Sequence, residues 1–256
     1  MCMTVNNGKQ LDIRTSAGVF SRYAIKTHFI TIGEDYIALL ERYVKPSYCR
    51  GDIVSISEKV ISLCQGRVIY KKDMKLSRLA RFLSGFASHS SAGIGVDSVW
   101  KMQFAIDHCG AARIIFAALC GGVAKLFGRK GVFYDIAGPE VRGLDGFYDQ
   151  AFPEYGDYGI RLPENADQVC NEIYQKTGMQ AIIVDANDFT CDILGVAAAV
   201  CHSRKVLGEM LRDNPSGQSA QQTPFVLIRD TKPILRLQTH RAAYTDTRED
   251  GALPVR

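Results

Sequence analysis

The stretch Gln180-Ala-Ile-Ile-Val-Asp185 is an apolar, β-branched run that ends on an acid. Such a run predicts a buried, central β-strand. An acid at the carboxyl end of a buried strand lies where open sheets collect ligands and metals, because the strand holds it rigidly and the next loop leaves it accessible. The following Ala-Asn-Asp188 adds oxygen donors, which together suit a hard cation carrying phosphates. The alternative, equally open from position alone, is that Asp185 caps a turn.

Outward from this strand, strand and helix patterns intermix without a regular βαβ period. We therefore predict an α+β fold, with an irregular mixed β-sheet and packed helices, rather than a doubly wound fold. The predicted strands cover residues 24–32, 53–57, 66–70, 131–136, 181–184 and 225–228. The predicted helices cover residues 33–44, 75–86, 99–109, 112–128, 166–176 and 203–212.

The chain is expected to form one main domain with two flanking segments. Residues 1–23 form an N-terminal arm and residues 238–256 a polar C-terminal tail. Residues 24–237 form the domain, which could divide into lobes of about residues 24–130 and 131–237.

The composition excludes several classes of protein. The chain has 256 residues, 46% apolar and 23% charged, which is the balance of a folded globular protein. Its net charge of +4 is too small to indicate nucleic acid but suits an anionic substrate. Eight cysteines occur without a C-x-x-C pair, so we expect free thiols and a reducing, cytoplasmic setting. The longest apolar stretch, residues 114–124, is well short of the roughly 20 residues that span a bilayer, so no membrane partner is expected.

A second candidate for metal chemistry is Asp145, in the loop Gly138-Pro-Glu-Val-Arg-Gly-Leu-Asp-Gly146 after a predicted strand. Its carboxylate could share a metal with Asp185 or hold a second one. The alternative is an Asp-Gly turn, which is the more common role of this dipeptide. Asp97, in Gly-Val-Asp97-Ser, precedes a predicted helix and is better explained as its N-terminal cap.

Two further segments could bind an anion. Ser57-Glu58-Lys59 ends a predicted strand, and Lys59 or the nearby Arg67 could hold a phosphate, although a solvated strand end explains the same residues. Residues 214–223 include glycine and hydroxyl groups that can cradle an anion, but they do not form a P-loop motif. His28 is more simply a hydrogen-bonded core or edge histidine. The sequence contains no G-x-S-x-G, H-E-x-x-H or helix-opening G-x-G-x-x-G motif.

Taken in order, several motifs resemble the coenzyme F-420-0:L-glutamate ligases, a family of gamma-glutamyl ligases. The N-terminal half carries Lys26-Thr-His-Phe-Ile-Thr31-x-Gly-Glu-Asp35 and Gly51-Asp-Ile-Val-Ser-Ile-Ser-Glu-Lys59, followed by Gln65-Gly-Arg67. The C-terminal half carries Leu162-Pro-Glu-Asn-Ala-Asp167, Thr177-Gly178, Ala181-Ile-Ile-Val-Asp185 and Gly217-Gln-Ser219-x-x-x-Thr223-Pro224. The resemblance covers about residues 24–230, nearly the whole chain.

Members of this family use a nucleoside triphosphate, usually GTP, to activate a carboxylate of a deazaflavin coenzyme precursor as an acyl phosphate, which L-glutamate attacks. The resemblance implies GTP or ATP as co-substrate, Mg2+ or Mn2+, an anionic acceptor (a deazaflavin precursor or a folate-like molecule) and an intertwined homodimer. It places Asp145 and Asp185 at metal-binding positions, and their 40-residue separation fits the family. It implies nucleotide or metal contacts for Lys26, Thr27, His28, Phe29, Ser57, Glu58, Lys59, Gly217, Gln218 and Ser219. No residue is assigned as catalytic.

The segment after Asp185 departs from the family. The family has a hydroxyl residue and then Phe-Gly-Arg-Pro, whereas this chain has Ala186-Asn-Asp-Phe189. This departure motivates a second hypothesis, a degenerate nucleotide- or cofactor-binding protein without ligase activity. A third is a purely structural dimerisation module.

Overall fold

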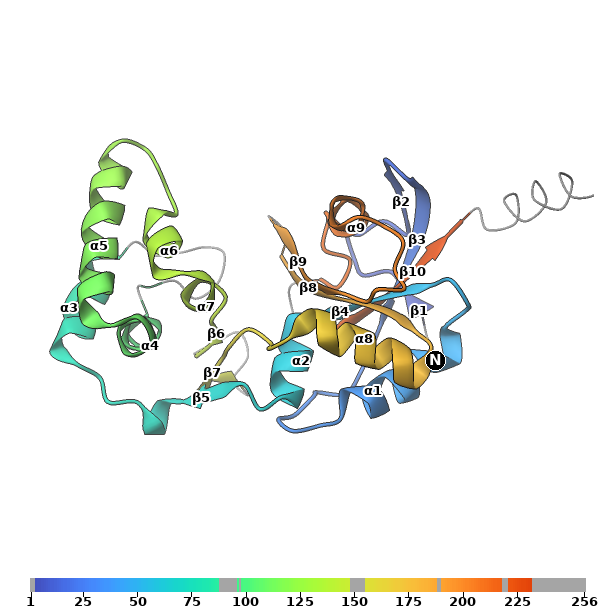
Figure 1. Cartoon of the computed structure of the whole chain (residues 1–256), viewed down its shortest axis with the longest axis horizontal. Coiled ribbons are helices and arrows are strands. Elements are labelled where there is room, and N and C mark those ends of the chain that lie inside the picture. The colour runs from blue at the N-terminus through green and yellow to red at the C-terminus, as the bar shows by residue number, and fades with distance from the viewer. Residues whose placement is uncertain are drawn as a thin grey trace, which may run out of the picture.

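The computed structural model describes residues 3–87, 96, 98–147, 155–187, 190–217 and 221–231. The described residues form a main β-sheet covered by helices at one end of the molecule and a helical unit at the other (Figure 1). A small three-stranded sheet lies between the two. The predicted α+β class with a mixed sheet is thereby confirmed.

The strands of the described residues fall into two sheets. The main sheet contains β1 (Met3–Thr4), β2 (Asp12–Thr15), β3 (Gly18–Ile25), β4 (Ile53–Ser57), β8 (Gln180–Ala186), β9 (Cys191–Val196) and β10 (Phe225–Asp230). The small sheet contains β5 (Val68–Tyr70), β6 (Asp145–Gly146) and β7 (Tyr158–Ile160).

The helices divide in the same way. Those next to the main sheet are α1 (Tyr36–Tyr43), α2 (Glu58–Cys64), α8 (Ala166–Thr177) and α9 (Arg204–Leu211). The helical unit contains α3 (Arg78–Phe86), α4 (Val99–Cys109), α5 (Ala111–Leu126), α6 (Val132–Ala137) and α7 (Pro139–Arg142). Two short 3-10 helices, η1 (Lys45–Ser47) and η2 (Lys71–Asp73), connect neighbouring elements.

The main sheet has the order β1-β3-β10-β4-β8-β9, with β2 paired to β3. Strands β4 and β8 are parallel, whereas every other described pair is antiparallel. Strand β8 lies inside the sheet between β4 and β9, and its residues Ala181–Val184 are at most 2% exposed. The sequence prediction of a buried central strand is therefore confirmed, because the β-branched run packs on both faces.

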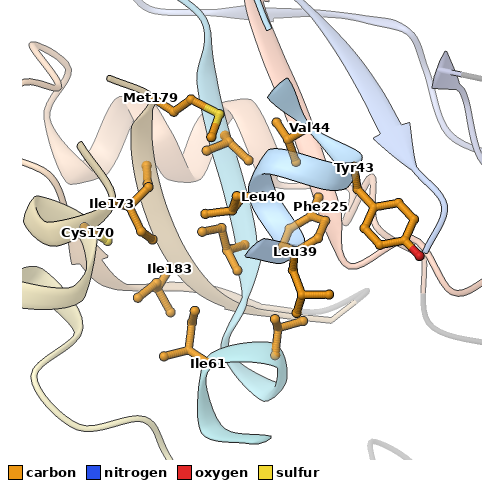
Figure 2. Packing of buried hydrophobic residues seen from close by; sticks show 14 of the residues in the cluster. Leu39, Leu40, Tyr43, Val44, Ile61, Cys170, Ile173, Met179, Ile183 and Phe225 are labelled. Atoms are coloured by element: carbon orange, nitrogen blue, oxygen red, sulfur yellow. The ribbon is translucent and has the colours of Figure 1, made fainter. Parts of the chain in front are cut away.

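Helices cover both faces of the main sheet. Helices α1, α2 and α8 pack on one face, where Leu40, Ile61, Ile173, Ile183 and Phe225 form the centre of the larger core (Figure 2). Helix α9 packs on the opposite face through side chains such as Leu207 and Met210. Strand β8 thus supplies alternate residues to two cores, which fixes its register and the position of Asp185 at its end.

The helical unit has its own core, so it is a separate packing unit. Its buried side chains include Met102, Phe104, Ile114, Val141 and Leu144. The sequence suggested a division near residue 130, but that position lies within this unit, between α5 and α6, which pack on each other.

Two predicted segments differ from the structure. Residues 131–136, expected as a strand, instead form helix α6 (Val132–Ala137) after Gly131, which is its left-handed N-cap. The segment is helical because it packs on α5, with Phe133 and Ala137 in the core of the helical unit. The strand expected over residues 24–32 ends at Ile25, because its neighbour β10 begins opposite this residue at Phe225.

The N-terminal segment is also more ordered than the sequence indicated. Instead of a loosely ordered arm, Asp12–Thr15 and Gly18–Ile25 form a hairpin at the main sheet, and Met3–Thr4 pairs with the same strand. Ile13 and Phe20 are buried in the core under α9. The expected C-terminal tail, residues 238–256, lies outside the described residues.

The described part of the chain contains no helix that is both long and apolar enough to cross a membrane. Its cysteines, Cys49, Cys64, Cys109, Cys120, Cys170, Cys191 and Cys201, are free thiols, as the sequence predicted. Cys170 is buried in the core, whereas Cys49 and Cys201 are exposed.

Gly195→Ala is expected to destabilise the protein by about 1–3 kcal/mol, because the added Cβ would overpack a close backbone contact. It would lie 2.5 Å from the carbonyl carbon and oxygen of Ala166 at the start of α8. Thermal unfolding measures the effect, expected as roughly 2–4 °C for each kcal/mol. Gly208→Ala in α9 is the matched control, because nothing lies within 4 Å of its added Cβ. If the two variants melted alike, the approach of β9 to α8 would be wrong.

Candidate functional site

One edge of the main sheet collects three of the segments singled out in the sequence. Ile25 of β3 and Ile56 of β4 both pair with Phe225, the first residue of β10, so β3 and β4 end at the same edge. Strand β8 runs parallel to β4, with Val184 beside Ser57, and ends there too. The segments that follow these strands, residues 26–29, residues 57–59 and Asp185, therefore lie along one edge.

A cluster of three carboxylates lies beside this edge. Glu58 is the first residue of α2, Asp185 is near the end of β8, and Asp145 is in β6 of the small sheet. Lys59 contacts two of them, because its Nζ lies 2.5 Å from Oδ2 of Asp145 and 3.5 Å from Oε1 of Glu58. The charges of Lys59 and Asp145 also act on Asp185. Residues 40 to 127 positions apart in the sequence are thus brought together. We call Glu58, Lys59, Asp145 and Asp185 the acid cluster.

Burial and mutual repulsion shift the acids of this cluster. Glu58 is 3% exposed, and its burial raises its pKa to about 8, with Lys59 opposing the shift and Asp185 and Asp145 adding to it. Burial also raises the pKa of Asp185, again opposed by Lys59 and reinforced by Asp145. A carboxyl group with a pKa near 8 keeps its proton at neutral pH, so Glu58 is a neutral acid there. Such shifts are typical of functional sites, although structural ion pairs also produce them.

Neither Asp185 nor Asp145 has the turn role that the sequence left open for it. Asp185 is not a turn cap, since β8 continues to Ala186 and Asp185 pairs with Asp192 of β9. Asn187 is the residue whose side chain bonds across the turn, because its Oδ1 accepts the backbone N–H of Thr190 at 2.9 Å. Asp145 is not in an Asp-Gly turn, since Asp145–Gly146 forms strand β6.

The sequence did not identify Lys101 as part of this region. Lys101 of α4 is 3% exposed, and its Nζ donates to the carbonyl oxygens of Leu144 at 2.7 Å and Arg142 at 3.2 Å. It fixes the backbone next to Asp145, and its charge favours ionisation of Asp185. A lysine on the inner face of an amphipathic helix is the only sequence signal for it, and that signal does not identify its partners.

The segment of residues 26–29 lies between the sheet edge and helix α1. The backbone N–H of Thr27 donates to the carbonyl oxygen of Gln222 at 2.9 Å, just before β10. The ring of His28 bridges two groups, with Nδ1 2.6 Å from the Tyr43 hydroxyl and Nε2 2.8 Å from Oε2 of Glu34. His28 is therefore a hydrogen-bonded edge histidine, the simpler of the two sequence interpretations, and its exposure leaves it accessible.

The rest of this segment contributes an exposed cation and an aromatic ring. Lys26 is exposed directly after β3. The ring of Phe29 lies 5.0 Å from that of Tyr155, centroid to centroid.

The loop before β10 reaches the same edge. Its turn is closed by Asn214, whose backbone oxygen accepts the N–H of Gly217 at 3.0 Å. Gly217 has a φ of 78°, in the left-handed region that favours glycine. The carbonyl oxygen of Pro224 accepts the backbone N–H of Ser57 at 2.9 Å, which joins the loop to the strand end of β4. Gln218 and Ser219 lie outside the described residues.

Arg67, the alternative phosphate ligand, is engaged elsewhere. Its guanidinium pairs with Glu164 and Glu140 and donates from Nε to the carbonyl oxygen of Leu162 at 3.0 Å. Arg161 pairs with the same Glu140 at 3.0 Å. These contacts connect β5 to the segment before α8, so Arg67 has a structural role.

The carboxylates of the acid cluster are oxygen donors, the ligand type that a hard divalent cation prefers. Within the described ranges, no three His, Cys, Asp or Glu side chains converge closely enough to form a complete metal cage. Mg2+ in nucleotide sites usually has one or two carboxylate ligands and takes the rest from phosphates and water. Asp145 and Asp185, next to a buried third acid, can supply that smaller ligand set.

Glu58→Gln is expected to raise the stability of the metal-free protein at alkaline pH. The folded-state pKa of about 8 exceeds the unfolded value of 4.5. Between these two pH values the folded state binds more protons than the unfolded state, so wild-type stability falls as the pH rises from the lower to the higher value. Replacing this titratable carboxyl group by an amide should therefore stabilise the protein at pH 8 by roughly 3 kcal/mol more than at pH 5.

Thermal unfolding in EDTA at these two pH values measures this difference for Glu58→Gln. Glu41→Gln, an exposed acid on α1 paired with Lys45, is the control and should show no such dependence. Equal melting temperatures of wild type and Glu58→Gln at pH 8 would mean that Glu58 ionises freely.

No protein-family model matches the chain. A search among curated proteins finds no significantly similar sequence. The functional interpretation therefore depends on the residues of the site and on the motif resemblance in the sequence.

Proposed function

We propose that this chain is a nucleoside-triphosphate- and divalent-metal-dependent amide ligase, which joins L-glutamate to a carboxylate of an anionic small molecule. The observation that supports it most is the acid cluster at the edge where β3, β4 and β8 end. The segments that the ligase resemblance assigns to the nucleotide, residues 26–29 and the loop at Gly217, adjoin the same edge. GTP or ATP as co-substrate, Mg2+ or Mn2+, and a homodimer belong to the proposal.

In the proposed reaction, an oxygen of the acceptor carboxylate attacks the γ-phosphorus, and the nucleoside diphosphate leaves. The α-amine of glutamate then attacks the carbonyl carbon of the acyl phosphate, inorganic phosphate leaves, and the amine proton goes to solvent or to a base. A divalent cation, when bound, would offset the repulsion between polyphosphate and carboxylate. Asp145 and Asp185 would hold it.

Two side chains of the cluster have further roles in this proposal. Lys59 is 32% exposed and lies between Glu58 and Asp145, so its ammonium can turn from Asp145 to a phosphate oxygen when a cation takes over the carboxylate. Glu58, neutral at pH 7, limits the negative charge of the cluster before the anionic nucleotide arrives.

A second candidate function is nucleotide or cofactor binding without ligation. The observation that favours it is the tight β8–β9 hairpin. Asn187 is committed to its turn, donating from Nδ2 to the Thr190 hydroxyl at 3.0 Å, where the ligase family has a hydroxyl residue followed by Phe-Gly-Arg-Pro. A chain of this kind would bind the metal–nucleotide complex and release no phosphate.

Phosphate release distinguishes the two functions. The full chain is incubated with GTP or ATP, Mn2+ or Mg2+, L-glutamate and a panel of deazaflavin precursors and folates. The ligase proposal predicts phosphate release that requires both glutamate and one acceptor, with one amide product for each phosphate. Release that is independent of glutamate, or nucleotide binding without any release with every acceptor, would contradict ligation.

A further inference from the structure

Helix α5 lies at the end of the molecule farthest from the main sheet (Figure 1). It exposes an apolar face. Only its residues Ile114 and Ala117 are buried. Leu126 is 85% exposed and the C-cap residue Phe127 is 80% exposed. The other large apolar side chains exposed on this helix are Ile115, Phe116, Leu119 and Val123. Within the described residues, α5 therefore presents most of its apolar surface to the outside.

A shallow hollow lies on this face. Its volume is about 520 Å³, and its lining is apolar except for Arg129. The lining includes Phe116, Leu119, Val123 and Phe127. An open apolar hollow with a guanidinium in its wall suits a ligand that has a hydrocarbon chain and an anionic head group.

The helical unit is also basic, in contrast to the rest of the chain. Residues 71–142 contain eleven Lys and Arg against five Asp and Glu, whereas the remaining residues contain 20 against 22. Arg129 and Lys130 are exposed just after the apolar face. The positive charge is thus concentrated in the unit that carries the exposed apolar helix.

A second helix of the unit repeats this combination. On α3, Phe82 is 63% exposed and Phe86 is 75% exposed, and their rings pack together at 4.9 Å between centroids. Arg78 and Arg81 are exposed on the same helix. Aromatic side chains next to arginines are typical of helices that lie in a membrane interface.

We propose that the helical unit docks on an anionic lipid membrane, with the face of α5 in the boundary between head groups and acyl chains. The apolar side chains supply hydrophobic burial, and the basic residues meet the negative surface potential. A second copy of the chain explains the apolar face less well, because two units of the same positive charge would repel each other. Docking of this kind needs no membrane-spanning helix, so it is compatible with the absence of one among the described residues.

Vesicle flotation of the full chain tests the proposal. The probes are vesicles of phosphatidylcholine alone and of phosphatidylcholine mixed with phosphatidylglycerol, at low and high salt. We expect the chain to float with the mixed vesicles at low salt, and the bound fraction to fall about tenfold or more with the neutral vesicles or at high salt.

Two variants and one control divide the effect. Leu126→Ser combined with Phe127→Ser removes apolar contact, and Arg129→Glu combined with Lys130→Glu reverses charge. Each double variant should abolish flotation. Each should also keep a melting temperature near that of the wild type, because all four side chains are exposed. Tyr174→Ser, at a 43% exposed position on α8, should float like the wild type.

Three outcomes would overturn the proposal. The first is no flotation with phosphatidylglycerol vesicles. The second is equal flotation of the wild type and both variants. The third is a wild-type dimer in sedimentation equilibrium that Leu126→Ser with Phe127→Ser makes monomeric, because the face of α5 would then be an interface between two copies.

Discussion

Asp185→Asn is expected to reduce glutamate-dependent phosphate release by about a hundredfold or more. A metal that offsets charge in phosphoryl transfer contributes several kcal/mol, and each 1.36 kcal/mol corresponds to a factor of ten in rate. The amide of asparagine keeps the shape of the side chain but provides a weaker, neutral oxygen ligand. Initial rates of phosphate release at saturating nucleotide measure the effect.

The fold should tolerate this substitution, which separates a chemical from a structural effect. Burial and the neighbouring Asp145 raise the pKa of Asp185, so the folded state disfavours its charge, and the asparagine variant should melt at or above the wild-type temperature. Asp12→Asn makes the same change at an exposed position on β2 and should retain full activity. Ligation by Asp185→Asn at the wild-type rate would show that the proposed role of Asp185 is wrong.

Asp213→Ala is expected to destabilise the protein by about 3–5 kcal/mol, because it leaves a buried charge without its partner. The side chain of Arg22 is fully buried, and both of its terminal nitrogens bond the Asp213 carboxylate. The same nitrogens donate to the carbonyl oxygens of Met210 and Gln10, so Arg22 connects β3 to α9 and to the N-terminal segment. Thermal unfolding should show a decrease of roughly 6–20 °C.

Two further variants test whether the orphaned charge of Arg22 causes this loss of stability. Glu41→Ala removes an exposed pair with Lys45 and should change the stability by less than about 1 kcal/mol. Arg22→Met added to Asp213→Ala removes the orphaned charge and should recover part of the loss. A double variant less stable than Asp213→Ala would contradict this explanation.

The pH dependence of the same pair follows from the pKa of Asp213. Burial alone would raise that pKa, but the hydrogen bonds and charge of Arg22 outweigh it and hold the pKa below its usual range. The contribution of Asp213 to stability is therefore present above the unfolded pKa and is lost as the pH falls through the folded one. Wild type and Asp213→Ala should differ less in stability at strongly acidic pH.

The sequence predicted the elements whose signals are local. The β-branched run before Asp185 forms β8, and Gly178 takes the left-handed position that ends α8, with a φ of 73°. The helix expected from Gly33 also forms but begins later, at Tyr36, because Asp35 is its N-cap and accepts the backbone N–H of Ile37 at 2.8 Å. In each case residues within one or two turns decide the conformation, so the pattern is sufficient.

The sequence did not predict elements that depend on distant partners. The run Val132-Phe-Tyr-Asp-Ile-Ala137 has apolar residues compatible with either period, and packing on α5 makes it a helix. The two-residue strand Asp145–Gly146 exists only through its pairing with Ile160 and Gly159 of β7.

For the candidate site, residue types could be predicted but their contacts could not. Only the ligase resemblance assigned Asp185 and Glu58 to one site, and the sequence did not indicate that β4 and β8 are parallel neighbours. Nothing in the sequence indicated that Lys59 pairs with Asp145 or that Lys101 is buried beside it. The Lys59–Asp145 pair joins α2 to the small sheet, whereas the bonds of Lys101 lie within the helical unit. Both depend on packing between residues that are far apart in the sequence.

The most direct test of the proposed function is a calorimetric titration of the full chain with GTP and with ATP, each with and without Mn2+. We expect one of the two nucleotides to bind in the presence of Mn2+, with at least about tenfold weaker binding in EDTA and a comparable loss in Asp185→Asn. If folded wild-type protein gave no binding heat with either nucleotide and Mn2+, and its melting temperature did not rise, the acid cluster would not be a metal–nucleotide site.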